Sequence, residues 1–571
     1  MLKNSSITEE GCAALISAFD SNPSNLIELD LSGNKLENSG IEKIFLLLKN
    51  PQCKFMKLKL SDCSITEEGY KALASALRSN PSHLIELDLT GNDPGQSGVK
   101  QLSDLLQVKN HKLKLRFLGP TADEACQYVK GIVGKNPLLL RELNLSENKL
   151  RVNQITALLQ DKHCKLNTLI LNNSDITEED CRVLASALNS NPSNLTELNL
   201  SQTKLRNSGM KIFSTLFKNE QCRLKKLKFN SICITEEGCS ALVSAFNSNP
   251  SNLIELDLSG NKLGDSGVTQ ISSLMRNVQF SLQILRLSDC SITEEGYNAL
   301  ASALRSNPSH LIELDLTGND PGQSGVKELS DLLQDPNYQL KTLRFLGRAA
   351  EEACKYLTEV LHIKNPLLLR ELNLSEHELG DTGVNQISAL LQDKHCKLNT
   401  LTLKNSSITE EGCAALISAF DSNPSNLIEL DLSGNKLGNS GIEKICLLLK
   451  NPQCKFMKLN PAAQEACEYL TKVLGTSPLL LTELDLSEDK LGDLDGEKLS
   501  ALLVDSHSKL EKMKLNNCEL TEKSCSVLAT VLSSKTILKE MNLNNSRLLD
   551  SGVKVICEGL KKSVCELKIL K

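Results

Sequence analysis

Leucine and other apolar residues recur along the chain in one short pattern, LxxLxLxxNxL or LxxLxLxxCxI. Clear examples are LIELDLSGNKL at 26–36, LTELNLSQTKL at 195–205 and LQILRLSDCSI at 282–292. The units begin at residues 26, 55, 84, 113, 140, 166, 195, 224, 253, 282, 311, 340, 369, 398, 427, 456, 481, 510, 538 and 567, and fifteen of the nineteen intervals are 29 residues. So regular a period predicts one repeat architecture rather than three or four separate domains.

Each unit predicts a short strand followed by a turn and a helix. The xLxLx core alternates with a period of two, as a strand does. The residue three places after the last strand leucine, such as Asn34 or Cys63, fits a turn position whose side chain bonds backbone groups. The next segment, as in ITEEGCAALISAF (7–19) or NSGIEKIFLLL (38–48), has a helical pattern. In the first of these helices Thr8 is a good N-cap, and the apolar face is predicted to contain Ala14, Leu15 and Phe19.

Strand, helix and parallel strand together form right-handed βα units. We therefore predict an α/β fold over residues 1–571: a single curved solenoid of about twenty βα repeats of 28–29 residues. The parallel β-sheet lies on its concave face and the helices lie on its convex face. Three atypical repeats, at 113–139, 340–368 and 456–480, lack the usual turn, and we expect a kink in the curvature there.

The chain begins inside a unit. Residues 2–58 match 403–459 except at two positions, so Leu2 corresponds to Leu403, the last strand leucine of its unit. We expect 1–25 to be a truncated first repeat, a cut edge from truncation, duplication or an incomplete gene model. Its first apolar face would then be uncapped, although solenoids need polar terminal caps. The far end, LKILK, likewise stops within a strand.

Composition narrows the function. The net charge of −6, from 64 basic and 70 acidic residues, gives no basic footprint for nucleic acid. No apolar stretch is long enough for a membrane span, and no signal peptide is recognised. The twenty cysteines fall mostly into recurrent single positions without a C-x2-C pair, which predicts buried thiols rather than disulfides or zinc sites. A cytoplasmic, reducing setting is expected.

The repeat LxxLxLxxNxL, with a helix in every unit of 28–29 residues, resembles the ribonuclease-inhibitor class of leucine-rich repeats, a horseshoe solenoid, over the whole chain. The sequence LIELDLSGNKLGDSGVTQISSLM (253–275) is also similar to the repeat region of NLR receptors, which are cytosolic innate-immune sensors. The similarity is greatest to the NLR receptors of bony fishes. In that family a NACHT ATPase module precedes the repeats. No GxxxxGK[ST] phosphate loop is present in this sequence, so no NACHT module is recognised.

The residues between the strand leucines are predicted to point to the concave face. Alternate units carry acidic residues there, and the intervening units are neutral or basic. Since neighbouring strands lie ~4.8 Å apart, cross-strand ion pairs should form. We interpret this face either as a surface that binds a protein or as a row of ion pairs in which the charges pair only with one another. It comprises Glu28, Asp30, Lys57, Lys59, Glu86, Asp88, Glu142, Glu197, Lys226, Lys228, Glu255, Asp257, Arg286, Glu313, Asp315, Arg344, Glu371, Glu429, Asp431, Glu483, Asp485, Lys512, Lys514 and Glu540.

Three functions follow from these patterns. The first is a protein-binding scaffold. The resemblance implies that it is the ligand-sensing or autoregulatory region of an NLR-type receptor, or of a NACHT-less relative or fragment of one. Its partner would be another protein or a NACHT module in cis. The second is a stoichiometric ribonuclease inhibitor, although no Tyr lies on a predicted concave strand position. The third is a repeat fragment with no independent function. We expect no enzyme activity, because the His and carboxylate positions recur with the repeat instead of converging in a cleft. We also expect no cofactor, no metal, and no binding to nucleic acid or to a membrane.

Overall fold

A computed structural model describes most of the chain. The described residues are 2–21, 26–50, 52, 54–79, 84–106, 114–116, 142–144, 146, 152–160, 164, 166–191, 194–249, 253–307, 310–333, 340, 342–344, 371–375, 379–392, 396, 398–423, 427–448, 458–460, 482–485, 487, 503, 508–517, 520, 522–534, 536–562 and 564–570. The chain forms two compact units. Unit 1 comprises Met1–Val129, Asp431–Ser433 and Gly438–Lys571, and unit 2 comprises Lys130–Leu430 and Gly434–Leu437.

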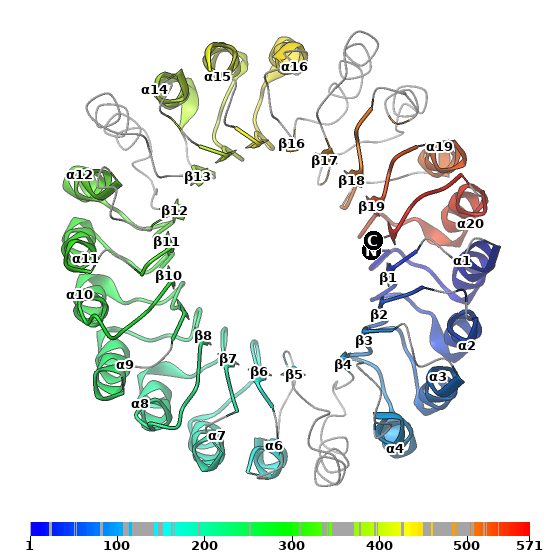
Figure 1. Cartoon of the computed structure of the whole chain (residues 1–571), viewed down its shortest axis with the longest axis horizontal. Coiled ribbons are helices and arrows are strands. Elements are labelled where there is room, and N and C mark those ends of the chain that lie inside the picture. Colours follow the sequence, from blue (N-terminus) through cyan, green and yellow to red (C-terminus); the bar gives the residue numbers. More distant parts are fainter. Residues whose placement is uncertain are drawn as a thin grey trace. The chain divides into compact units, whose positions relative to one another are not determined.

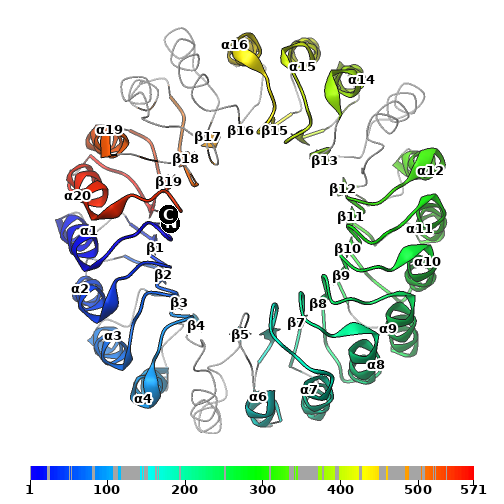
Figure 2. The same ribbon diagram turned by 180° about the vertical axis from the view of Figure 1, so that it is seen from behind.

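Unit 1 is built on short parallel strands from both ends of the chain (Figures 1 and 2). The pairing runs β16, β17, β18, β19 and β20, and then continues through β1, β2, β3 and β4. These strands are Lys458–Asn460, Glu483–Asp485, Lys512–Lys514, Glu540–Asn542, Ile569–Leu570, Glu28–Asp30, Lys57–Lys59, Glu86–Asp88 and Lys114–Arg116. The helices are α1 Glu9–Ser21, α2 Glu37–Lys49, α3 Glu67–Ser79, α4 Gly95–Leu106, α16 Gly438–Leu448, α19 Glu522–Ser533 and α20 Leu549–Leu560.

Unit 2 repeats the same strand and helix order. Its parallel strands β5–β14 pair in sequence order, and β15 follows them. The strands are Glu142–Asn144, Thr168–Ile170, Glu197–Asn199, Lys226–Lys228, Glu255–Asp257, Ile284–Arg286, Glu313–Asp315, Thr342–Arg344, Glu371–Asn373, Thr400–Thr402 and Glu429–Asp431. The helices are α6 Val152–Leu159, α7 Glu178–Ser190, α8 Arg206–Phe217, α9 Glu236–Ser248, α10 Gly264–Met275, α11 Glu294–Ser306, α12 Gly322–Leu333, α14 Gly380–Gln392 and α15 Glu410–Ser422.

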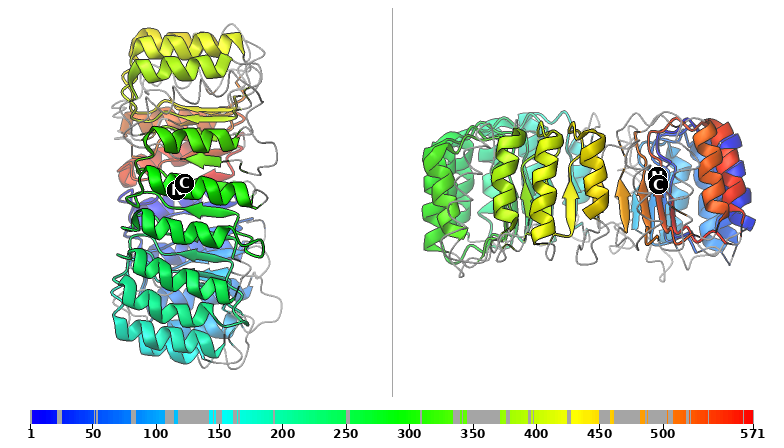
Figure 3. Two further views of the ribbon diagram at one scale, coloured as in Figure 1. Left: turned by 90° about the vertical axis from the view of Figure 1, so that its left-hand side faces the viewer. Right: turned by 90° about the horizontal axis from the view of Figure 1, so that it is seen from above.

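Aligned leucines explain why the strands stack in register. Leu285 of β10 pairs with Leu256 of β9 and with Leu314 of β11, and all three side chains are buried. Helices cover that face of the sheet, and successive helices lie side by side (Figure 3). Because side chains alternate along a strand, the residues that flank each leucine point away from the helices. We call this second surface the open face. The predicted α/β solenoid is thus confirmed within each unit.

The turn after each strand is fixed by the asparagine that the repeat places there. Asn261 lies in the turn after β9 and is 1% exposed. Its Oδ1 accepts the amide N–H groups of Ile232 (3.0 Å) and Ile234 (3.2 Å). Its Nδ2 donates to the carbonyls of Phe229 (2.8 Å) and Leu258 (2.7 Å). One side chain therefore satisfies four backbone groups of two consecutive repeats, which goes further than the turn role predicted from the sequence.

The helices bury the apolar face that their spacing predicts, with one difference. In α1 the side chains of Leu15 and Phe19 are buried, but Ala14 is half-buried and Cys12 and Ile16 occupy the core instead. No disulfide forms among the cysteines whose side chains the structure describes, and all of these except Cys233 are buried. Burial raises the pKa of the Cys12 thiol to about 12, so this group packs as a neutral side chain. None of the helices among the described residues is long and apolar enough to cross a membrane.

The expectation that the first apolar face is uncapped is wrong. Leu2 and Ile7 are buried. Helix α20 packs against α1, and β20 pairs with β1 inside unit 1. The kink expected at 113–139, 340–368 and 456–480 falls outside the described residues, apart from the short strands β4, β12 and β16 and from Leu340.

Candidate functional site

The open face carries charged side chains in columns because consecutive strands pair without a shift in register. Glu255 faces Ile284 of β10, and Ile284 faces Glu313 of β11. Asp257, Arg286 and Asp315 lie opposite one another in the same way. The sequence places each charge, and the fixed register of the leucines brings the columns together.

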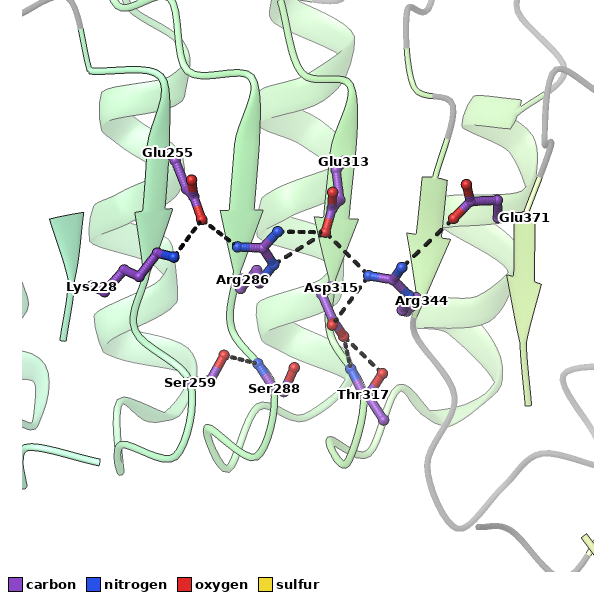
Figure 4. A network of polar contacts seen from close by, with 10 residues as sticks. All are labelled: Lys228, Glu255, Ser259, Arg286, Ser288, Glu313, Asp315, Thr317, Arg344 and Glu371. Atoms are coloured by element: carbon purple, nitrogen blue, oxygen red, sulfur yellow. Dashed lines mark hydrogen bonds and ion pairs between the residues drawn. The ribbon is translucent and has the colours of Figure 1, made fainter. Parts of the chain in front are cut away.

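The strongest charged network runs over β8–β13 of unit 2 (Figure 4). Arg286 Nη1 lies 2.5 Å from Glu255 Oε1, and its Nη2 lies 3.0 Å from Glu313 Oε1. Arg344 Nη1 lies 3.1 Å from the same Glu313 oxygen and 3.7 Å from Asp315 Oδ2. The network ends where Arg344 Nη2 lies 3.6 Å from Glu371. Two arginines thus join the five neighbouring strands β9–β13, and the predicted cross-strand pairing is confirmed here.

Glu255 is the most buried charge of this network, with 6% of its side chain exposed. Lys226 and Lys228 approach it at 3.8 Å and 3.7 Å from the opposite side to Arg286. Burial alone would raise the pKa of Glu255. The hydrogen bond from Arg286 and the charges of the two lysines outweigh burial, and the net pKa is lowered. Glu255 is therefore an anion held in place by three cations.

In unit 1 the face is held loosely at β1 and β2 and more tightly at β17 and β18. Lys57 and Lys59 each lie 3.9 Å from Glu28. Lys59 occupies the position that Arg286 has in the near-copy, and a lysine lacks the planar guanidinium fork that bonds two carboxylates. Further along, Lys514 bonds Glu483 at 2.6 Å and Asp485 at 3.4 Å. The same repeat thus gives both tight and loose versions of the face.

The aspartates of the predicted face also have a structural task. Asp257 Oδ1 accepts the amide N–H of Ser259 at 3.1 Å, and Asp315 Oδ1 accepts that of Thr317 at 3.1 Å. The other members of this group bond the residue two positions later in the same way, and they are Asp30, Asp88, Asp431 and Asp485. These side chains end the strand as Asx turns, so they are less available to a partner than the glutamates are.

The remaining predicted positions lie on the same face. Lys512 lies 3.8 Å from Glu483. The strand register places Glu86 beside Lys57, Glu142 beside Thr168, Glu197 beside Lys226, Glu429 on β15 and Glu540 beside Lys512. Lys57, Lys226 and Lys512, of whose side chains 48–49% is exposed, are accessible cations of the face.

A set of inter-repeat contacts at the start of the helices was missed by the sequence analysis. Asp265 of α10 accepts hydrogen bonds from Thr293 N (2.8 Å), Thr293 Oγ1 (2.6 Å) and Gly296 N (3.0 Å). Asp381 of α14 binds Thr409 and Gly412 in the same way. The sequence pattern that could have revealed these contacts is the alternation of helices that begin with [DN]-[ST]-G and helices that begin with ITEEG. The aspartate contact fixes the N-terminus of one helix to the preceding helix.

No site for a metal is formed by the described residues, where no group of three or more His, Cys, Asp or Glu side chains converges. The carboxylates of the open face lie along an extended series of strands, and several of them, including Glu28, Glu255 and Glu313, are paired with cations. This arrangement can recognise charge over many strands.

Comparison with known proteins places this architecture in a family. The family model described as Leucine Rich repeat matches residues 22–45, 249–272, 367–388 and 423–446. The chain is 34% identical to the ribonuclease inhibitor of Sus scrofa over 554 residues, which is 95% of this chain and 94% of that protein. It is 33% identical to the ribonuclease inhibitor of Mus musculus over 80% of this chain and 87% of that protein. The chain belongs to the ribonuclease-inhibitor family of leucine-rich-repeat proteins.

This leucine-rich-repeat protein is also similar to part of an NLR receptor. It is 36% identical to NACHT, LRR and PYD domains-containing protein 3 of Bos taurus over 272 residues, or 47% of this chain. It spans 26% of the length of that protein. The two resemblances found in the sequence are thereby confirmed, while the role of the open face stays a proposal.

Proposed function

We propose that this chain is a protein-binding scaffold that offers the open face of its sheet to a protein partner, as the ligand-sensing or autoregulatory region of an NLR-type receptor. The observation that carries this proposal is the open face itself. Over β8–β13 glutamates alternate with lysines and arginines from strand to strand, and each glutamate of this central network is oriented by the neighbouring cations.

The alternation favours a folded protein as the partner. A complementary surface must carry both signs of charge at the strand spacing of ~4.8 Å, which a folded protein can present. A nucleic acid carries a single sign, and its binding needs an extended basic surface. Oriented charges also favour specificity, since a wrongly charged partner meets repulsion at several strands.

The NLR assignment rests on resemblance. The matched relative has NACHT, LRR and PYD domains in its name, and this chain matches only 26% of its length. We infer that a NACHT module is a partner of the open face. A cytosolic setting agrees with the buried cysteines, which form no disulfide among the side chains that the structure describes, since disulfides are typical of oxidising compartments.

Removing accessible charges from the open face tests the proposal. We expect the triple variant Lys57→Gln, Lys226→Gln, Lys512→Gln to bind the purified NACHT module of a bony-fish NLR receptor more weakly than the wild type does. The expected loss is on the order of tenfold, since three exposed pairs at about 0.5 kcal/mol each approach the 1.4 kcal/mol of one decade. Isothermal titration calorimetry measures the Kd.

The matched control removes three exposed charges from the helix side, with Lys43→Gln on α2, Lys100→Gln on α4 and Lys218→Gln at the end of α8. This variant should bind as the wild type does. Equal losses in the two triple variants would contradict a role for the open face, and no binding by the wild type would remove the NACHT module as the partner.

A second candidate is a ribonuclease inhibitor, which the similarity over 95% of the chain favours. Tight interfaces usually use aromatic anchors, but Tyr70 and Tyr297 are buried in α3 and α11. We therefore expect a pancreatic-type ribonuclease to keep its activity in the presence of micromolar purified chain, measured by hydrolysis of a fluorogenic RNA substrate. Stoichiometric loss of activity would establish the inhibitor instead. If neither probe binds, the remaining hypothesis is a repeat without an independent function.

A further inference from the structure

The first and last repeats of unit 1 pack against each other as consecutive repeats do. β20 pairs with β19 on one side and with β1 on the other, through Glu28↔Ile569 and Leu29↔Leu570. The amide N–H of Ile27 donates to the carbonyl of Lys568 at 2.7 Å, just as that of Met56 donates to Ile27 at 2.8 Å. The chain ends lie close together, with α20 beside α1, in Figures 1 and 3.

The turn of this repeat comes from the other end of the chain. Leu2 N donates to Asp30 O at 2.7 Å, which is the bond that Leu31 N makes to Lys59 O at 2.9 Å one repeat later. Leu2 therefore takes the place of the last strand leucine, while Leu570 takes the place of the leucine before it. The segments LKIL (567–570) and LKNSSI (2–7) together supply the apolar positions of one unit.

The buried asparagine of the next repeat bonds this divided unit in the way that its equivalents bond an uninterrupted unit. Asn34 Nδ2 donates to Leu2 O at 2.7 Å, and Asn34 Oδ1 accepts from Ser5 N (3.1 Å) and Ile7 N (3.0 Å). Asn92 makes the equivalent bonds to an uninterrupted unit at 2.7, 2.9 and 3.1 Å. Residues 2–7 thus have the same partners as an internal turn.

The helices are joined by the contact that joins α10 to α11. Asp550 of α20 accepts from Thr8 N (2.9 Å), Thr8 Oγ1 (2.6 Å) and Gly11 N (3.0 Å). The three corresponding bonds of Asp265 are 2.8, 2.6 and 3.0 Å long. Lys554 of α20 also lies 2.7 Å from Glu10 of α1. The side chains at both ends are therefore those that an internal repeat boundary requires.

We propose that residues 567–570 and 2–7 are the two halves of a single leucine-rich repeat, and that the end face of the first repeat is an interaction surface whose partner is the last repeat of the same molecule. We call this contact the N–C junction. It is held by backbone hydrogen bonds, by the bonds of Asn34 and Asp550, and by the contact of Lys554 with Glu10. The inference is independent of the partner of the open face.

Zero-length cross-linking of the unmodified protein tests the N–C junction. A carbodiimide should join Lys554 to Glu10, whose charged atoms are 2.7 Å apart, with a yield comparable to that of Lys211 and Glu237, which are 3.5 Å apart on the internal helices α8 and α9. Cross-linking an equal mixture of 15N-labelled and unlabelled protein distinguishes a contact within one molecule from a contact between two copies. We expect each linked Lys554–Glu10 peptide pair to be either wholly 15N-labelled or wholly unlabelled. Mixed peptides would assign the surface to a second copy, and absence of the link beside a normal control link would show an open junction; either result overturns the proposal.

A matched pair of variants gives a second, independent readout. Asp550→Ala should accelerate amide exchange in α1 on the order of tenfold, as Asp265→Ala should in α11, because each removes three bonds that hold the first turn of the next helix. Hydrogen exchange with mass spectrometry measures both helices in each variant. Rapid exchange of α1 in the wild type, with no change in Asp550→Ala, would contradict the N–C junction.

Discussion

Replacing Asn261 by alanine is expected to destabilise unit 2 by about 3–5 kcal/mol, because the amide N–H groups of Ile232 and Ile234 lose their partner in a buried turn and each costs about 1–3 kcal/mol. Two carbonyls lose a donor as well. Urea denaturation followed by circular dichroism measures the loss, and hydrogen exchange of residues 228–236 locates it.

Two further variants serve as controls for Asn261→Ala. Asn319→Ala should cost a similar amount, because Asn319 makes the same four bonds one repeat pair later. Asn261→Thr should cost less, since Thr203 already occupies this turn position in the chain and donates to Leu200 O at 2.7 Å. A loss below about 1 kcal/mol in both alanine variants would show that the asparagine turns do not hold the repeats together.

The second large effect is expected for Arg286→Met. The variant leaves Glu255, which is 6% exposed, without its 2.5 Å bond, while the methionine keeps most of the packing of the arginine stem. We expect a loss of about 2 kcal/mol at neutral pH, as for a partly buried charged hydrogen bond. Arg182→Met removes an equally short but exposed pair with Glu178 and should cost less than about 0.5 kcal/mol.

The pH dependence identifies the cause of the loss. The folded-state pKa of Glu255 is lowered below the ordinary value of 4.5, so its contribution to stability is present above that value and is lost as the pH falls through the folded-state pKa. Arg286→Met removes the main interactions that lower this pKa while burial remains. The difference in unfolding free energy between wild type and variant should therefore shrink as the pH is lowered from 7 to about 3. A difference that does not change with pH would show that lost packing, and not charge, explains the effect.

The repeat, its strands and its open face could be predicted from the sequence because the leucines that fix the register recur with a period of 29 residues. The register places Arg286 opposite Asp257 and diagonal to Glu255, which explains why cross-strand ion pairs form, but only the structure shows that Arg286 bonds Glu255. The helix-to-helix bonds of Asp265 could not be derived so easily. They join side chains that are 28–31 residues apart, and only the three-dimensional stacking of two helices shows which partners meet.

The N–C junction shows a further limit of sequence analysis. A pattern read along the chain describes the first repeat as cut, because the strand that completes it, Ile569–Leu570, lies at the other end of the sequence. Parallel strands need no covalent continuity to pair, so Leu570 can fill the position before Leu2 from the other end of the chain. The same backbone bonds form whether or not the two segments are consecutive.

The central claim is that the open face binds a protein, and lysine footprinting tests it most directly. The purified chain is acetylated briefly, alone and with the NACHT module of a bony-fish NLR receptor, and the modified lysines are quantified by mass spectrometry. We predict that acetylation of Lys57, Lys226 and Lys512, about half of whose side chains is exposed, falls in the complex, while that of the helix-side Lys43, Lys100 and Lys218 is unchanged. Protection of the helix-side lysines alone would contradict the assignment of the binding surface to the open face.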